Sequence, residues 1–419
     1  MKRDFTICFI APEFLPLWGG VGSYSVQLLE NLSKEMEIHV VTLKRLLKNG
    51  YGVAGRSECP PTFGENIHIH YISTASDTLF YNVRFQFSCL REIPKLHDRY
   101  HFDLIHSHHC HMPDVLLQLS HALRIPTVTT VHNMFKWMRT SILKQSTNFQ
   151  NLDRSEKGIL VFYPMLKYLE RFYLSNVQSL IAPSKNCREE LINFLDIPQE
   201  KIHVIYNGVN PEIFSPNSRD DPVFLTDLQL TSRPVVLFVG RIVAQKGLKT
   251  LMAAVPRVAE QLPNVLFMFV GAGDFSYYQR QLKEYGVSNE NFLNLGYFSY
   301  LDMPKIYSLA NVFVLPSPHE NCSVSLLEAM GCEIAVVAAN VGGNSEIIRP
   351  YHNGMLFTSE NSKELAEIII QLIEDANLQK KLGLQARRTV IEKFSVQKMA
   401  AETVKVYEEA VGSYRERCG

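Results

Sequence analysis

Two glutamates eight residues apart, Glu320 and Glu328, form the clearest chemical pattern in this sequence. The apolar residues 312–315 precede them and predict a buried strand that ends at a turn. Apolar residues then recur at helical spacing, so we expect a helix to begin near Ser323 or Ser325. Glu320 would lie on the loop between strand and helix, and Glu328 in the first turns of the helix. Backbone N–H groups and the positive end of the helix dipole favour an anionic ligand there.

The same stretch also has a purely structural interpretation. Ser325 and Glu328 have the spacing of a capping box, in which the serine accepts a hydrogen bond from the backbone near Glu328 and the glutamate reaches back to the cap. On this alternative, Glu328 stabilises a helix end and binds no ligand. The local pattern alone leaves both interpretations open.

Two cations, Arg241 and Lys246, follow a second predicted strand at residues 234–240. Both lie at a strand-to-helix junction, because a helical pattern runs from there to about residue 261. Two solvated charges are the ordinary interpretation of such a pair. A guanidinium and an ammonium held at one junction can instead bind phosphate oxygens.

Histidines gather at two further strand ends. The first group consists of His106, His108, His109, Cys110 and His111. Successive side chains of a strand alternate sides and no second cluster offers the remaining ligands, so we predict a polar strand end facing a cleft and no metal site. His132 ends another buried strand, at the edge where open α/β sheets bind ligands. A lone histidine there can be structural or catalytic.

The elements that would position these residues alternate between strands and helices. Residues 5–10 predict a buried strand that leads through Gly19 and Gly20 into a helix, which is the opening of a doubly wound α/β unit. A nicotinamide-binding domain is excluded, because Ser25 occupies the third glycine position and the next strand ends in Thr42 rather than in an acid.

The chain has 419 residues, enough for two domains with separate cores. Polar residues and prolines in 216–232 predict a linker, so we place the domains at 1–216 and 217–395. Residues 44–65 have no clear period and predict a loop, a kind of segment that often contributes to a binding site. Residues 135–160 predict a mobile polar loop, whose basic residues are too few for stable membrane anchoring.

Several motifs, taken in order, resemble those of glycosyltransferase family 4, which are retaining enzymes of the GT-B fold. They are Asp-x-x-His-x-His from Asp103, Gly-Arg-x4-Lys-Gly from Gly240, Glu-x7-Glu-Ala-Met-Gly from Glu320, Gly-Gly-x-x-Glu-Ile-Ile from Gly342 and Asn-Gly-x-Leu-Phe from Asn353. The resemblance covers nearly the whole chain. It implies an α/β protein with two facing, doubly wound Rossmann-like domains and a cleft between them. It also implies that the last helix, within 396–419, packs back on the N-terminal domain.

The resemblance assigns roles to the residues singled out above. His132 would contact the donor sugar or the leaving phosphate, Arg241 and Lys246 would hold the diphosphate, and Glu320 would hold the sugar. These four are the predicted catalytic residues, and Glu328 would bind the ribose hydroxyls. The predicted donor-binding residues are Gly19, Gly20, Gly240, Arg241, Lys246, Gly271, Gly273, Glu320, Asn321, Cys322, Ser323, Val324 and Glu328.

The implied reaction moves a hexosyl group from a UDP- or GDP-linked sugar to a glycan, lipid or small-molecule acceptor, for example in cell-envelope glycan synthesis. Fixed cations stabilise the charge that grows on the leaving diphosphate, so we expect no metal and no other cofactor. Glu320 would act electrostatically rather than as a nucleophile, because no second carboxyl flanks the same bond. Many members have Gly-Phe-Gly where this chain has Asn321-Cys322-Ser323, which leaves the donor open.

Three alternatives stay open at this point: a nucleotide-sugar epimerase of the same fold, a sugar-phosphate synthase, and a non-catalytic sugar-nucleotide binder. The formal net charge of zero argues against nucleic acid as a partner. The eight scattered cysteines, the missing signal peptide and the lack of a membrane-spanning apolar run predict a cytoplasmic protein. Contact with the inner face of the membrane through the N-terminal domain would be peripheral.

Overall fold

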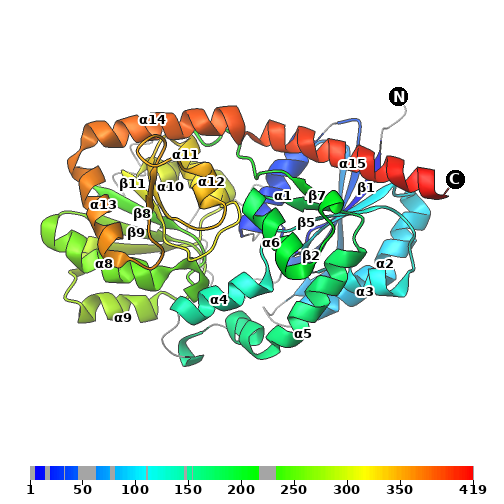
Figure 1. Ribbon diagram of the computed structural model, residues 1–419, viewed down its shortest axis with the longest axis horizontal. Coiled ribbons are helices and arrows are strands. Elements are labelled where there is room, and N and C mark those ends of the chain that lie inside the picture. Colours follow the sequence, from blue (N-terminus) through cyan, green and yellow to red (C-terminus); the bar gives the residue numbers. More distant parts are fainter. Residues whose placement is uncertain are drawn as a thin grey trace.

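The N-terminal part of the chain forms a seven-stranded parallel sheet (Figure 1). The computed structural model describes residues 5–14, 19–32, 34–45, 63–75, 81–109, 112–145, 149–152, 154–216 and 233–418. The strand order is β3-β2-β1-β4-β5-β6-β7. The strands are β1 (Thr6–Ile10), β2 (Glu37–Arg45), β3 (Ile67–Ala75), β4 (Leu104–His108), β5 (Thr127–Thr130), β6 (Ser179–Ala182) and β7 (Ile202–Val204).

The C-terminal part forms a six-stranded parallel sheet in the order β10-β9-β8-β11-β12-β13. Its strands are β8 (Val235–Val239), β9 (Leu266–Val270), β10 (Phe292–Gly296), β11 (Val312–Leu315), β12 (Ala335–Ala339) and β13 (Met355–Phe357). The central strands are short apolar runs because helices cover both faces of the sheet. The two sheets confirm the predicted pair of doubly wound α/β units.

Helices connect the strands in both halves and cover the faces of the sheets (Figure 1). In the first half they are α1 (Gly20–Asn31), α2 (Tyr81–Tyr100), α3 (Val115–Ser120), α4 (Phe135–Gln145), α5 (Arg154–Asn176) and α6 (Lys185–Leu195). In the second half they are α8 (Leu248–Gln261), α9 (Ser276–Glu284), α10 (Met303–Ser308), α11 (Val324–Gly331), α12 (Asn344–Ile347), α13 (Ser362–Glu374), α14 (Ala376–Lys393) and α15 (Val396–Cys418).

The prediction of a mobile polar loop over residues 135–160 was wrong. This stretch contains α4 and the first turns of α5. Helix α4 packs between α5 and the C-terminal domain, where it contacts α8 and the short 3-10 helix Ala244–Lys246 (η5). One of its contacts is polar, since Gln145 Nε2 donates to Thr250 Oγ1 at 3.2 Å. Polar side chains that pack against another domain do not give the apolar period that sequence analysis detects.

The C-terminal helix α15 lies along the N-terminal domain, after α14 has run along the C-terminal one (Figure 1). Val396, Met399 and Tyr407 belong to one core cluster with residues of β1 and α1. The domain boundaries themselves stay a prediction, because residues 217–232 lie outside the described part of the chain. Among the described residues, no helix is both long and apolar enough to cross a bilayer.

Candidate active site

The strand order of each sheet reverses at one point, and the predicted functional residues cluster there. In the C-terminal sheet β8 and β11 are neighbours; β9 and β10 follow on the β8 side, and β12 and β13 follow on the β11 side. Open α/β sheets bind ligands beyond the carboxyl ends of the strands at such a point. The loops after β8 and β11 are residues 240–247 and 316–323, which carry the cation and glutamate motifs. In the N-terminal sheet the reversal lies between β1 and β4.

An ion pair between Lys246 and Glu320 joins these two loops. Lys246 Nζ lies 2.6 Å from Glu320 Oε1, and the two side chains are 28% and 11% exposed. Lys246 ends the 3-10 helix η5, and Gly247 follows with φ of +74°. A Cβ atom on Gly247 would lie 2.0 Å from the carbonyl oxygen of Pro316. Only glycine allows this approach, which brings the ammonium to the carboxylate.

The turn before α12 supports the loop after β11 from another side. The Gly343 N–H donates to the Glu320 carbonyl at 2.9 Å. A Cβ atom on Gly343 would lie 1.5 Å from the Asn321 carbonyl oxygen, so a larger residue would displace the loop. The Gly-Gly motif at this turn therefore helps to fix the position of Glu320.

The three residues that depart from the common Gly-Phe-Gly all have partners within the protein. Asn321 Nδ2 donates to the carbonyl of His132 at 3.0 Å, across the domain interface. The Cys322 side chain lies in the core of the C-terminal domain, and its carbonyl accepts from Asn207 Nδ2 at 2.6 Å. Ser323 caps α11, because its hydroxyl accepts from the backbone of the helix. Asn321 and Asn207 thus hold the loop that carries Glu320 (residues 316–323) against the N-terminal domain.

The capping-box interpretation of Ser325 and Glu328 was wrong. Helix α11 begins one residue after Ser323, so Ser325 lies inside it. The Glu328 side chain is 5% exposed, and its Oε2 accepts from the Tyr307 hydroxyl at 2.8 Å. Burial raises the pKa of Glu328 to about 8, although the hydrogen bond from Tyr307 lowers it. The buried carboxyl is therefore mostly protonated at neutral pH.

A chain of hydrogen bonds fixes the ring of His132. His132 Nε2 lies 3.0 Å from His108 Nδ1, and His108 Nε2 lies 3.3 Å from the Ser25 hydroxyl. Ser25 donates its only proton to the carbonyl of Val21, so it accepts from His108 Nε2. When both rings are neutral, His108 Nδ1 then accepts from His132 Nε2. This assignment leaves His132 Nδ1 as a hydrogen-bond acceptor, and Tyr24 packs edge-on against the ring at 4.7 Å.

We predicted that the other histidines form a polar strand end facing a cleft. For those that the structure describes, this prediction was wrong. His106, His108 and His109 are all buried. His106 lies within hydrogen-bond distance of Thr130 and of Tyr407 on α15, and burial lowers its pKa to about 3. His106 and His108 have polar partners on distant segments, and His109 Nε2 lies 3.0 Å from the buried Glu170 carboxylate. Cys110 and His111 lie outside the described residues.

The remaining predicted residues lie on neighbouring loops and helix starts. Arg241 is exposed directly after Gly240, and Gly271 and Gly273 follow β9. Gly19 is the N-cap of α1, Gly20 is its first residue, and Val324 is the first residue of α11. Helices α1 and α11 contact each other across the domain interface. The role of these residues in donor binding stays a prediction.

Two interdomain contacts were missed by sequence analysis. The Glu346 carboxylate accepts from the first two backbone N–H groups of α6, at Lys185 and Asn186, and from the Tyr206 hydroxyl at 2.6 Å. His319 stacks on Trp137 of α4 with ring centroids 4.2 Å apart. Burial lowers the pKa of His319 to about 4. Glu346 belongs to the Gly-Gly-x-x-Glu motif. The motif indicates a functional site, but it does not reveal that Glu346 binds the start of α6 in the other domain.

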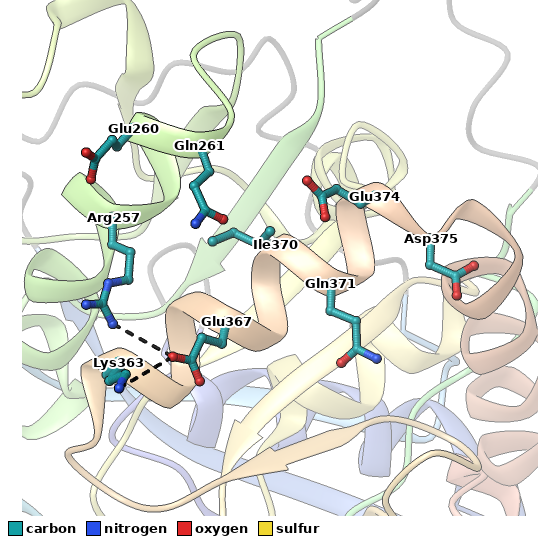
Figure 2. A pocket seen from close by; sticks show the side chains of 9 residues that line it. All are labelled: Arg257, Glu260, Gln261, Lys363, Glu367, Ile370, Gln371, Glu374 and Asp375. Carbon is teal, nitrogen blue, oxygen red and sulfur yellow. Dashed lines mark ion pairs between the residues drawn. The ribbon is translucent and has the colours of Figure 1, made fainter.

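An open groove of about 770 Å³ lies away from these residues, between α8 and α13 (Figure 2). Its side chains are mainly charged or amide-bearing and come from the surfaces of both helices. Glu367 lies 3.8 Å from Arg257 and 4.0 Å from Lys363. These exposed pairs contribute little binding energy, so we assign the groove to the solvated helix surface.

Comparison with known proteins gives a consistent result. Residues 18–213 match the model of Glycosyltransferase Family 4, and residues 227–389 match that of Glycosyl transferases group 1. An uncharacterized glycosyltransferase of Methanocaldococcus jannaschii is 30% identical over 314 residues, 74% of this chain and 76% of that protein. The alpha-maltose-1-phosphate synthase of Mycolicibacterium smegmatis is 30% identical over 260 residues, 58% of this chain and 66% of that protein.

The fold also has a close structural counterpart. The structure of sucrose-phosphate synthase from Thermosynechococcus elongatus has a TM-score of 0.78 to this chain at 21% identity. The match covers 98% of this chain and 100% of that chain. This likeness identifies the architecture of two facing α/β domains.

Proposed function

Because this chain belongs to glycosyltransferase family 4, is a hexosyltransferase and uses a nucleotide-sugar donor, we propose that it transfers a hexosyl group with retention from a UDP- or GDP-linked sugar. The observation that carries the proposal is the Lys246–Glu320 ion pair at the reversal point of the C-terminal sheet. It provides a cation for the leaving diphosphate beside a carboxylate for the sugar. Both charges are held in place before the substrate arrives, as transition-state stabilisation requires.

The proposed roles of the individual residues are those that the family resemblance implies, and their positions are compatible with them. Lys246 and Arg241 bind the diphosphate and stabilise the charge that grows on it as the glycosidic bond breaks. The leaving phosphate accepts the proton of the attacking hydroxyl on the same face of the sugar. Glu320 orients Lys246 and supports the positive charge that develops on the sugar ring. Glu328 binds the ribose hydroxyls.

The hydrogen-bond chain through His108 supports one of the two roles proposed for His132. With its Nδ1 as an acceptor, His132 accepts a hydrogen bond from a hydroxyl of the donor sugar. A phosphate oxygen needs a hydrogen-bond donor. His132 Nδ1 could donate to it only after the ring has been protonated. Contact with the sugar is therefore the assignment that the network supports.

A donor panel with a charge deletion tests this function. Binding and slow hydrolysis of UDP-glucose, UDP-N-acetylglucosamine, GDP-mannose and ADP-glucose are compared in the wild type and in Lys246→Ala. We expect one donor to bind and be consumed, and Lys246→Ala to lower the rate roughly 10²–10³-fold. The exposed Lys249 on α8 supplies the control Lys249→Ala. An unchanged rate in Lys246→Ala would remove Lys246 from the mechanism.

A phosphorylated sugar is the second candidate for the acceptor. The Mycolicibacterium relative and the Thermosynechococcus neighbour are both named for phosphorylated sugar products. Release of the nucleotide is measured with the identified donor and either glucose 1-phosphate, fructose 6-phosphate or the corresponding free sugars. Faster release with a phosphorylated sugar supports this acceptor class, and equal release with the free sugars contradicts it.

The exposed face of α5 supports peripheral contact with the inner face of the membrane. Val161, Phe162, Met165 and Tyr168 are 53–72% exposed and recur at helical spacing. Such an apolar stripe on a surface helix favours an amphipathic interface, and Lys157 and Lys167 on the same helix favour anionic lipid.

Sedimentation with anionic vesicles tests this contact. The double variant Phe162→Ser, Met165→Ser should lose vesicle binding, whereas Leu384→Ser, an exposed apolar site on α14, should keep it. Equal binding by both variants would remove the α5 stripe from the interface.

A further inference from the structure

Three potential metal ligands come together on the N-terminal sheet, away from the candidate active site. Glu37 and His39 lie two residues apart on β2, so their side chains share one face of the sheet. His68 on the edge strand β3 is the direct partner of His39 in the parallel register. The three lie at the beginnings of their strands, whereas the candidate active site lies beyond strand ends. We propose that Glu37, His39 and His68 bind a divalent transition metal ion, with Zn²⁺ as the best fit.

The distances within the cluster match the coordination sphere of zinc. Glu37 Oε1 lies 3.2 Å from His68 Nε2 and 3.5 Å from His39 Nε2. The three ligand atoms all lie within 4.8 Å of one another. Two donor atoms bound at 2.0–2.1 Å to a tetrahedral ion are separated by about 3.3 Å. The distances to the carboxylate suit one ion, whereas the His39 and His68 rings, stacked with centroids 4.9 Å apart and planes at 30°, would turn so that both nitrogen lone pairs meet at it.

The orientation of His68 favours a shared ion over an internal hydrogen bond. Its Nε2 is buried and makes no hydrogen bond within the described part of the chain, although Glu37 Oε1 is within reach. The nitrogen therefore does not point along the line of a hydrogen bond to that oxygen. The nitrogen is thus available to an ion held beside the carboxylate.

A fourth residue, His70, supports the ring of His39 from behind. His39 Nδ1 lies 2.8 Å from His70 Nε2, and the two rings are stacked. When His39 Nδ1–H donates to His70, the lone pair of His39 is on Nε2, the atom that faces Glu37. Metal-binding histidines commonly donate their other ring N–H in this way, which fixes the tautomer. Tyr100 at the end of α2 packs on the His39 ring at 4.1 Å and holds its plane.

The ligand chemistry distinguishes among metals. Two imidazoles and one carboxylate suit Zn²⁺ and its neighbours, whereas Mg²⁺ and Ca²⁺ need a set of oxygen ligands. An ion here would link β2 to the edge strand β3, so its role is to secure that edge.

Zinc binding by the chelator-treated full-length protein tests the proposal. Uptake of Zn²⁺ is measured by calorimetry, and Co²⁺ is added separately, because tetrahedral Co²⁺ with nitrogen and oxygen ligands has a strong visible absorption. The variants are Glu37→Gln and His68→Gln, which keep shape and polarity, and His70→Ala behind the site. The exposed His352 in the C-terminal domain supplies the control His352→Gln.

We expect one equivalent of Zn²⁺ in the wild type and in His352→Gln, and thermal unfolding at a higher temperature with Zn²⁺ than with chelator. Glu37→Gln and His68→Gln should each bind at least about tenfold more weakly, and His70→Ala about 10–100-fold more weakly. Equal zinc affinity in all four variants would overturn the assignment and place the ion elsewhere. A wild type without zinc uptake would overturn it as well, leaving an ion-paired histidine cluster.

Discussion

Replacing Glu328 by glutamine tests whether the buried carboxyl touches the donor. Its pKa of about 8, against an ordinary value near 4.5, leaves roughly one tenth of the carboxyl ionised at pH 7. If ribose hydroxyls bind to the carboxylate, donor affinity should rise about tenfold as the pH increases from 7 to 9, which corresponds to about 1.4 kcal/mol. In Glu328→Gln the side chain does not titrate, so this rise should be absent.

The same substitution changes the pH dependence of stability with a defined sign. Between about pH 4.5 and pH 8 the unfolded chain has an ionised Glu328 while the folded chain keeps it protonated, so unfolding releases a proton. The free energy of unfolding should therefore fall as the pH rises through this window, by up to about 1.4 kcal/mol per pH unit from this group. Glu328→Gln removes this contribution.

Calorimetry with UDP-glucose and GDP-mannose at several pH values from 6.5 to 9 measures the first effect, because the diphosphate of a nucleotide sugar does not titrate there. Urea unfolding at the same pH values measures the second. Tyr307→Phe is a useful companion, because loss of its hydrogen bond should move the affinity profile to higher pH. Parallel affinity profiles in wild type and Glu328→Gln, together with a lost stability slope, would refute donor contact and leave Glu328 a buried structural acid.

Two further predictions concern residues that position the site. His108→Ala should lower kcat/KM for the donor by roughly tenfold or more, because the His132 ring then no longer has one fixed tautomer that presents an acceptor to the sugar; a pH–rate profile that matches the wild type would contradict this. Glu346→Ala should lower the free energy of unfolding by about 1–2 kcal/mol, because it removes the cap that α6 receives from the other domain. Equal urea midpoints for Glu346→Ala and wild type would show that the cap contributes nothing.

The sequence predicted the elements that follow a repeating apolar pattern, but it did not predict contacts between segments that are distant along the chain. The buried strands were recognised because parallel strands are short apolar runs between turns. Helix α4 was missed, since its buried face mixes apolar residues with polar ones such as Gln145, which contacts the other domain. The buried histidines on β4 were misplaced, because Tyr407, the partner of His106, comes from a helix some 300 residues later. Glu37 and His68 escaped notice, since the register of β2 and β3 brings them together.

The Asn321-Cys322-Ser323 segment shows how a departure from a family pattern can preserve the site. Each of the three side chains contacts other parts of the protein, since Asn321 bonds to the carbonyl of His132, Cys322 fills the core, and Ser323 caps α11. None of them needs the donor as a partner. In the proposed function, discrimination between donor sugars rests on Glu320, His132 and the backbone of this loop. Substituting glycine at 321 would loosen the hold of the loop on the N-terminal domain without adding a contact to the sugar.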